Sequence, residues 1–205
     1  MRRFAIGLVV GVLALLVLSQ LLLPPFLEER VASRITEDGG SADVELSAFP
    51  AVRLLWGDGK RFEVRGRGLK FVPGRGEQVF SRLDGFEEVR VEVRGLDVQG
   101  VDASRFTLTR LREGDPYRLS MRGQVSGREA IELIGSEAAG PLGGIAGGLA
   151  GSALPGAGTE LPLTVDADLV SRGGRADVVH TDATVAGFPA GPIAELVVSA
   201  VVKDL

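Results

Sequence analysis

The side chains that perform most enzyme chemistry are scarce in this chain. It contains a single histidine, His180, and no cysteine. Nucleophilic triads and most zinc sites require these residue types, often several of them together. His180 follows Val178 and Val179 near the end of a predicted strand, where we interpret it as an ordinary strand or turn residue. The composition therefore argues against a triad hydrolase and against a zinc enzyme.

Acidic residues and glycines are plentiful, but their spacing matches no catalytic or nucleotide-binding motif. Asp166 and Asp168 share one face of a predicted strand and could hold a cation, although a solvated face is the simpler interpretation. The run Gly57–Lys60 lacks the residues of a phosphate-binding P-loop, and Gly66–Gly68 lacks the third glycine of a dinucleotide fingerprint. We predict that the protein is not an enzyme and has no catalytic residues, no metal and no cofactor.

The segment Phe4–Leu23 is twenty residues long, carries no charge and directly follows Arg2 and Arg3. A helix needs about 20 apolar residues to cross the hydrocarbon core of a bilayer. A cleaved signal peptide has a shorter apolar region, about 7–15 residues, and a cleavage site of small residues, which is not found here. We favour a retained anchor over a cleaved signal, and the positive-inside rule places Arg2 and Arg3 in the cytoplasm.

This interpretation divides the chain into three parts. Residues 1–3 form a cytoplasmic tip, residues 4–23 a transmembrane anchor, and residues 24–205 one extracytoplasmic lipid-binding domain. Without cysteine, packing and strand pairing must stabilise the domain, because no disulfide can form. The predicted location is the cell membrane, with a single pass and the domain on the extracytoplasmic face.

The periodicity of the chain changes twice after the anchor. Pro24 and Pro25 are expected to end the first helix, because proline cannot continue one. A second, amphipathic helix is predicted from Leu27, Val31 and Ile35, which form one apolar stripe. From Ser41 the period is two, which predicts strands. These cover residues 42–47, 60–69, 86–98, 106–109 and 117–125, with a bend and a short helical turn over 49–57.

The second half of the chain is less regular. Ser126 and Glu129 form a capping box that predicts a helix to about residue 139. The uncharged glycine-rich segment 140–158 is expected to form a mobile lid or a membrane-touching loop or, alternatively, a flexible linker. Strands are predicted over 160–170 and 175–185, with a hairpin turn at Arg172–Arg175 and a break at 188–192. Residues 193–203 predict a terminal helix or, alternatively, a strand.

These elements predict an α+β fold, with an N-terminal transmembrane helix followed by a curved, mostly antiparallel sheet wrapped around one or two helices. In residues 86–98, valines alternate with charged residues, which is typical of a sheet covered on one side. Such a sheet leaves a long apolar groove that suits an acyl chain, since each buried CH₂ contributes about 0.8 kcal/mol. The predicted groove residues are Phe49, Leu54, Leu55, Trp56, Phe62, Val64, Val89, Val91 and Val93.

The charge of the chain is unevenly distributed. The formal net charge of −4 argues against a nucleic-acid partner. Between Arg53 and Arg75, however, seven basic residues stand against two acids, and such a stretch beside a membrane can meet anionic headgroups. The alternative is that these residues form solvated strand faces. The predicted headgroup residues are Arg53, Lys60, Arg61, Arg65 and Arg67.

The order of features over residues 24 to 185 resembles the LmeA-like family of actinobacterial envelope proteins. Phe49–Gly57 stands where that family has an F-P-x-x-x-x-L-x-G-like segment, and the charged strand residues Phe62–Arg65 follow. Val89–Val98 and the predicted helix at Gly127–Ile131 also fit its pattern. The resemblance implies an extracytoplasmic phospholipid-binding protein with a fold like the tubular lipid-binding proteins.

We therefore expect a membrane-anchored extracytoplasmic protein that holds or shuttles phospholipid for cell-envelope assembly. Its expected partners are phospholipid and the cytoplasmic membrane, and the sequence does not identify a protein partner. The alternative is a non-enzymatic structural or interaction module of the cell envelope without a ligand. An envelope hydrolase is a third possibility, which the scarcity of catalytic residue types disfavours.

Overall fold

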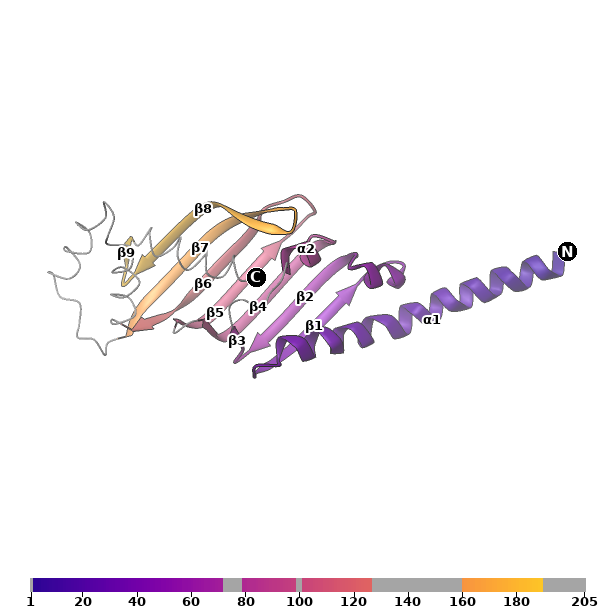
Figure 1. Ribbon diagram of the computed structural model, residues 1–205, viewed down its shortest axis with the longest axis horizontal. Helices are drawn as coiled ribbons and strands as arrows, with labels where there is room; N and C mark the ends of the chain where they lie inside the picture. The colour runs from indigo at the N-terminus through magenta and orange to yellow at the C-terminus, as the bar shows by residue number, and fades with distance from the viewer. Residues whose placement is uncertain (1, 72–78, 99–100, 127–159, 190–205) are drawn as a thin grey trace.

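The structure, a computed structural model, describes residues 2–71, 79–98, 101–126 and 160–189. The described strands form one sheet in the order β1-β2-β4-β5-β6-β7-β8-β9, with the short β3 also paired to β4 (Figure 1). The elements are α1 (Arg2–Ile35), β1 (Ser41–Ser47), η1 (Ala51–Trp56), β2 (Gly59–Arg67), β3 (Lys70–Phe71), α2 (Val79–Leu83), β4 (Phe86–Val98), β5 (Val101–Arg110), β6 (Tyr117–Ser126), β7 (Glu160–Arg172), β8 (Arg175–Val185) and β9 (Phe188–Pro189).

The sheet is mixed but mostly antiparallel. Strands β2 and β3 run parallel to β4, and all other described neighbours are antiparallel. A parallel pair requires a crossover between its strands, and the segment from β2 to β4 provides one that contains β3 and α2. The predicted α+β fold with a curved, mostly antiparallel sheet is therefore confirmed.

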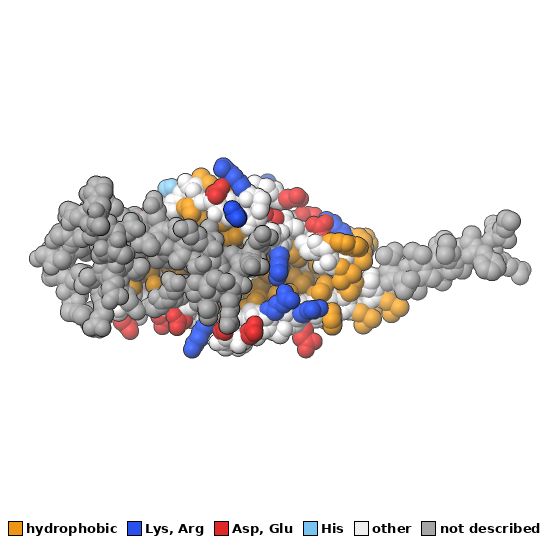
Figure 2. Space-filling view, viewed as in Figure 1, with side chains coloured by type: hydrophobic (Ala, Val, Ile, Leu, Met, Phe, Trp, Pro, Cys, Tyr) orange, Lys and Arg blue, Asp and Glu red, His pale blue; other side chains and the backbone are white. Residues whose placement is uncertain are grey.

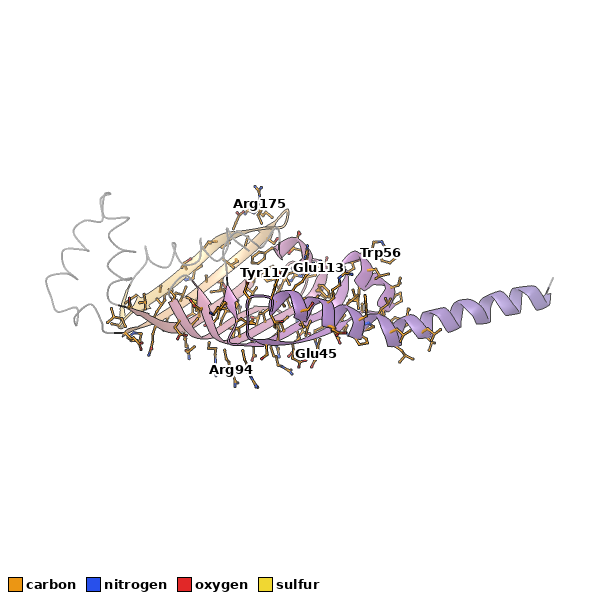
Figure 3. The ribbon with its side chains drawn as sticks, turned by 60° about the horizontal axis from the view of Figure 1, so that its bottom comes forward. Glu45, Trp56, Arg94, Glu113, Tyr117 and Arg175 are labelled. Atoms are coloured by element: carbon orange, nitrogen blue, oxygen red, sulfur yellow. The ribbon has the colours of Figure 1, made fainter. Side chains whose placement is uncertain are left out.

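The two faces of the sheet have opposite character. On β4, Val89 and Val93 are buried, whereas Arg90, Glu92 and Arg94 are exposed. We call the apolar side the inner face and the charged side the outer face. In Figure 3, Tyr117 lies on one side of the sheet, and Glu45 and Arg94 point away from the other. The alternation of the sequence predicted this division, because successive strand residues face opposite ways.

The C-terminal half of α1 packs along the β1 edge of the sheet (Figure 1). Its predicted apolar stripe, Leu27, Val31 and Ile35, lies against the hydrophobic core. The helix is also tied to β1 by a hydrogen bond of 2.8 Å, which the Leu46 N–H donates to Glu28 Oε1. Among the described side chains, which in α1 begin at Val17, no helix is both long and apolar enough to cross a membrane.

The prediction that Pro24 and Pro25 end the first helix is wrong. Helix α1 is continuous from Arg2 to Ile35 and contains both prolines. A proline inside a helix removes one hydrogen bond and crowds the carbonyl four residues earlier. On either side of the prolines, Gln20 and Glu28 accept hydrogen bonds from the domain. These contacts stabilise one continuous helix against the local preference for a break.

The N-terminal half of α1 projects past one end of the sheet, on the right in Figure 1. We call this the α1 end. According to the strand registers, η1, the start of β4, the β5–β6 turn and the β7–β8 turn all lie at this end. The opposite end carries the first residue of β1 and the last residues of β2, β4 and β6.

The predicted hairpin turn at Arg172–Arg175 joins β7 to β8, and it also contacts α2. Gly173 and Gly174 adopt positive φ angles of 62° and 82°, which favour glycine. A Cβ on Gly174 would collide with Ser81. The close approach therefore places α2 beside the turn between β7 and β8.

The sequence pattern does not predict three short elements, β3, α2 and β9. Strand β3 has two residues and α2 has five, which is too short for a period to be recognised. Phe188 and Pro189, where a break was expected, form the short β9 that pairs with β8. Three predicted segments lie outside the described residues, except for Ser126 itself. They are the helix from Ser126, the glycine-rich segment 140–158 and the terminal segment 193–203.

Candidate functional site

Five of the predicted groove residues lie side by side on the inner face. Phe62 of β2 is opposite Val89 of β4, and Val64 is opposite Val91. Val93 follows on the same face of β4. Val64, Val89 and Val93 are buried, and Phe62 and Val91 are half-buried. The alternating sequence was sufficient to place these five side chains on one surface.

This apolar surface continues across most of the sheet. Neighbouring strands lie about 4.8 Å apart, so a row that crosses six strands extends over about 24 Å. Its members are aliphatic or aromatic and, apart from the half-buried Val91, buried. The two rows are Val44-Val64-Val91-Leu108-Leu119-Ala167 and Val93-Phe106-Met121-Val165-Ala183.

The other four predicted groove residues lie at the α1 end, in and beside η1. Leu54 is buried in the core. Phe49, Leu55 and Trp56 instead expose 82%, 56% and 75% of their surface, so they do not line the inner face. The predicted helical turn is present, but it ends at Gly57, in the left-handed region, and directs two of its apolar residues outward. The structure therefore separates these residues from the sheet face.

Exposed apolar side chains from α1, from η1 and from Phe49 just before η1 together form what we call the apolar tip. The Ala51 N–H donates a hydrogen bond of 2.5 Å to Gln20 Oε1, which joins η1 to the helix. Figure 2 shows hydrophobic side chains gathered where α1 leaves the domain, and Figure 3 places Trp56 at the same end. The apolar tip consists of Val17, Leu18, Leu21, Leu22, Phe26, Phe49, Leu55 and Trp56. Exposed apolar patches of this kind mark protein or membrane interaction sites.

The backbone that follows η1 packs closely against the segment before β4. The Gly59 N–H donates to the Gly85 carbonyl at 3.0 Å, which links the start of β2 to the segment before β4. A Cβ on Gly85 would collide with the carbonyl oxygen of Gly57. Glycine is therefore required at residue 85, where the end of η1 packs against this segment.

The five predicted headgroup residues do not form one cluster. Arg53, Lys60 and Arg61 lie near the α1 end, whereas Arg65 and Arg67 lie further along β2, which runs away from that end. Three of the five are also ion-paired. Arg53 lies 3.5 Å from Asp58, and Arg61 Nε lies 2.9 Å from Glu88.

Arg65 is the most strongly paired of these residues. Its guanidinium lies 2.5 Å from Glu63 and 3.6 Å from Glu45. The hydrogen bond from Arg65 to Glu63, and then the charges of Glu63 and Glu45, raise the pKa of its guanidinium. Arg65 therefore contributes to a charged ladder on the outer face, and its cation is already matched by acids.

A buried polar network closes the inner face at the α1 end. Arg110 is only 4% exposed and lies on the apolar face of β5, next to Val89 of β4. Its Nη1 is 3.2 Å from Asp84 Oδ1, and its Nη2 donates to the carbonyl oxygens of Leu83, Asp84 and Phe86. We call the network of Asp84, Arg110, Tyr117 and Ser171 the clasp.

The remaining bonds of the clasp come from β6 and β7. The Tyr117 hydroxyl donates to Asp84 Oδ1 at 2.9 Å, and the Ser171 hydroxyl donates to Asp84 Oδ2 at 2.5 Å. The Tyr117 ring also lies under the Arg110 guanidinium at 4.6 Å and packs edge-on against Phe80 of α2. The clasp thus joins the α2–β4 segment to three strands of the sheet.

The clasp is suited to structure rather than to chemistry. Burial raises the pKa of the Tyr117 phenol, and the hydrogen bond to Asp84 adds to this effect, although the Arg110 charge opposes it. A phenol held in its neutral form is a poor nucleophile and a poor base. Sequence reasoning missed the clasp, although Arg110 does interrupt the apolar positions Phe106 and Leu108 on one strand face.

The residues considered for catalysis lie near one another on the outer side of β7 and β8. His180 and Asp166 are exposed, and Asp168 is half-buried opposite Arg118 and His180. Within the described ranges, no three histidine or acidic side chains are grouped so that they could hold a metal ion.

Comparisons of the chain with protein-family models, with curated proteins and with solved structures find no match.

Proposed function

We propose that this protein is a membrane-anchored extracytoplasmic phospholipid-binding protein that holds or shuttles lipid for cell-envelope assembly. The observation that carries the proposal is the apolar inner face, which crosses the sheet and ends beside the apolar tip. Two features, an apolar surface for acyl chains and an apolar tip at the exit of α1, are what a tethered lipid carrier needs. The transmembrane anchor over residues 4–23 and the likeness to the LmeA-like family and to tubular lipid-binding folds are parts of the same proposal.

The apolar tip sets the orientation that we propose at the membrane. Trp56 and Phe49 are large aromatic side chains, and Trp in particular is enriched at the boundary between hydrocarbon and headgroups. Because α1 and η1 are joined by the Gln20–Ala51 hydrogen bond, an anchor formed by the N-terminal part of α1 brings Trp56 and Phe49 to the bilayer surface.

The positions of the basic residues refine the predicted headgroup contacts. Arg53, Lys60 and Arg61 lie near the apolar tip and can meet headgroups there. A strand rises about 3.3 Å per residue, which puts Arg65 about 13 Å and Arg67 about 20 Å further along β2 than Arg61. We therefore assign the headgroup role to Arg53, Lys60 and Arg61 and exclude Arg65 and Arg67 from it.

Native mass spectrometry of the full chain, released from detergent micelles, tests the proposal. Co-purified phospholipid, or its uptake from liposomes, is the expected result. A chain that carries no phospholipid and takes none from liposomes would overturn the proposal and favour the structural or interaction module.

A further inference from the structure

Four arginines form a cross-strand row on the outer face. The strand registers place Arg67 opposite Arg94, Arg94 opposite Arg105, and Arg105 opposite Arg122. All four side chains are exposed, and Figure 3 shows Arg94 pointing away from the sheet. Since neighbouring strands lie about 4.8 Å apart, the four positions extend over about 14 Å. We call this set the arginine row.

Hydroxyl side chains continue the arginine row at both ends. Ser41 of β1 is opposite Arg67, and Thr164 of β7 is opposite Arg122, with Thr184 of β8 beyond it. A guanidinium has hydrogen-bond donors and no acceptor, and a hydroxyl can donate as well. Along this line, seven adjacent strands therefore present donors and no negative charge.

The arginine row is not neutralised by its neighbours. Elsewhere on the outer face, arginines are opposite acids, as in the pairs Arg65–Glu92 and Arg61–Glu88. Acids also occupy the next row, where Asp97 is opposite Asp102. Even so, no ion pair within 4.0 Å joins any of the four arginines to another described residue. Like charges directly opposite one another destabilise a sheet, so a bound anion would remove a cost that the free protein bears.

We propose that the arginine row binds a linear phosphate polymer that lies across the strands. Guanidinium groups bind phosphate oxygens through charge-assisted, often bidentate hydrogen bonds. Each strand of duplex DNA carries one phosphate charge about every 3.4 Å. A polyphosphate has no sugars between its phosphates, so its charges are at least as dense and can serve cations about 4.8 Å apart. The row therefore fits a polyanion of high linear charge density.

Two other linear polyanions fit this surface less well. An extended acidic peptide places successive same-side carboxylates about 6.8 Å apart, twice the rise per residue, which exceeds the spacing of the row. Single-stranded nucleic acid is normally held by aromatic side chains on which its bases stack. The row adjacent to the arginines contains Arg65, Glu92, Thr107 and Ser120 and offers no aromatic ring. The ligand is thus a phosphate polymer without bases.

This site is separate from the proposed lipid site. The arginine row lies on the outer face, whereas the apolar rows lie on the inner face. Arg67 is eight residues beyond Gly59 along β2, which corresponds to about 26 Å from the α1 end of that strand. Headgroups of a bilayer at the apolar tip therefore do not reach the row, and loss of lipid binding would leave this proposal standing.

The test measures binding of labelled inorganic polyphosphate to the full chain in detergent micelles by fluorescence anisotropy. Poly-L-glutamate and oligothymidylate with equal numbers of charges serve as competing polyanions. The row variant carries Arg94→Gln and Arg105→Gln. Its matched control carries Arg90→Gln and Arg118→Gln, which removes two outer-face arginines that have acids opposite them.

We expect the row variant to bind polyphosphate at least about tenfold more weakly, with a shallower dependence on salt, and the control to change by less than about threefold. A second row variant, Arg67→Gln with Arg122→Gln, should show the same loss of polyphosphate binding. It replaces the first variant as the test if the first variant misfolds. Equal losses in the row variants and the control overturn the proposal. Absence of polyphosphate binding, or binding of poly-L-glutamate or oligothymidylate as tight as that of polyphosphate, overturns it too.

Discussion

Tyr117 and Arg110 bind the same oxygen, Asp84 Oδ1, from two neighbouring strands, at 2.9 Å and 3.2 Å. The shared oxygen fixes the segment between α2 and β4 to the inner face of β5 and β6. Gly85, next along the chain, is in turn packed against Gly57 at the end of η1. The Asp84 carboxylate therefore belongs to one of the sets of contacts that join η1 to the sheet.

The clasp predicts that Arg110→Ala is strongly destabilising. The substitution leaves Asp84 without its cation and leaves the carbonyl oxygens of Leu83 and Phe86 without their donor. We expect the free energy of unfolding to fall by about 3 kcal/mol. Urea unfolding measures the change, with the exposed Arg118→Ala as a control that stays within about 0.5 kcal/mol. Similar values for the two variants would show that the clasp does not hold the fold together.

The raised pKa of Tyr117 predicts a loss of stability in alkaline solution. The ordinary pKa of the phenol is 10.0, and burial, followed by the hydrogen bond to Asp84, raises it in the folded chain. The folded chain therefore keeps a proton that the unfolded chain releases, so this stabilisation is complete below pH 10 and is lost as the pH rises above it. Tyr117→Phe removes this part of the pH dependence.

Tyr117 is the single tyrosine of the chain, so tyrosinate absorbance reports on it alone. In the folded protein, we expect its titration to begin well above pH 10, and in concentrated urea to return to about 10. A folded protein whose tyrosine titrates near 10 would contradict the buried, hydrogen-bonded environment of the clasp.

The proposed orientation predicts that Trp56 contacts lipid. It is the single tryptophan of the chain and is 75% exposed in the domain. In nanodiscs, brominated phospholipids should quench its fluorescence strongly, because the apolar tip lies at the bilayer surface. The control combines Trp56→Phe with Val179→Trp, which moves the probe to an exposed apolar position on β8. Equal quenching of the two probes, or none at Trp56, would exclude this orientation.

The arginine row predicts a stabilising substitution. Arg105 has an arginine opposite it on both neighbouring strands. Arg105→Thr should raise the free energy of unfolding by about 0.5 kcal/mol at low ionic strength, and salt should reduce the gain by screening the repulsion. Thermal unfolding at low and high salt measures this effect. If the substitution destabilises the chain equally at both salt concentrations, repulsion in the row is absent.

Most of the sheet could be predicted from the sequence because strict alternation appears directly in it. The valines of β4, the charged residues between them and the turn at Arg172–Arg175 all lie as expected. The break predicted at Pro24 and Pro25 does not occur, because contacts of α1 with β1 and η1 override the local preference of the prolines. Those contacts join residues 18 and 31 positions apart, which no local pattern reveals.

The candidate sites were less accessible to sequence reasoning. Phe49, Leu55 and Trp56 are apolar, but their outward orientation depends on how η1 packs. The clasp unites Asp84, Arg110, Tyr117 and Ser171, up to 87 positions apart. The arginine row can be recognised only from the strand registers, because its members are distant in the chain and become neighbours through strand pairing.

The central claim, that the inner face binds phospholipid, is tested most directly by the amount of phospholipid bound per chain. Native mass spectrometry of the full chain should find bound phospholipid in the wild type. Val91→Asp, on the inner face, should lower that amount severalfold, because a carboxylate among acyl chains is costly. Thr109→Asp introduces the same charge on the outer face, opposite Arg90 and Arg118, and should leave it unchanged. Wild-type protein that carries no phospholipid and takes none from liposomes would contradict the account.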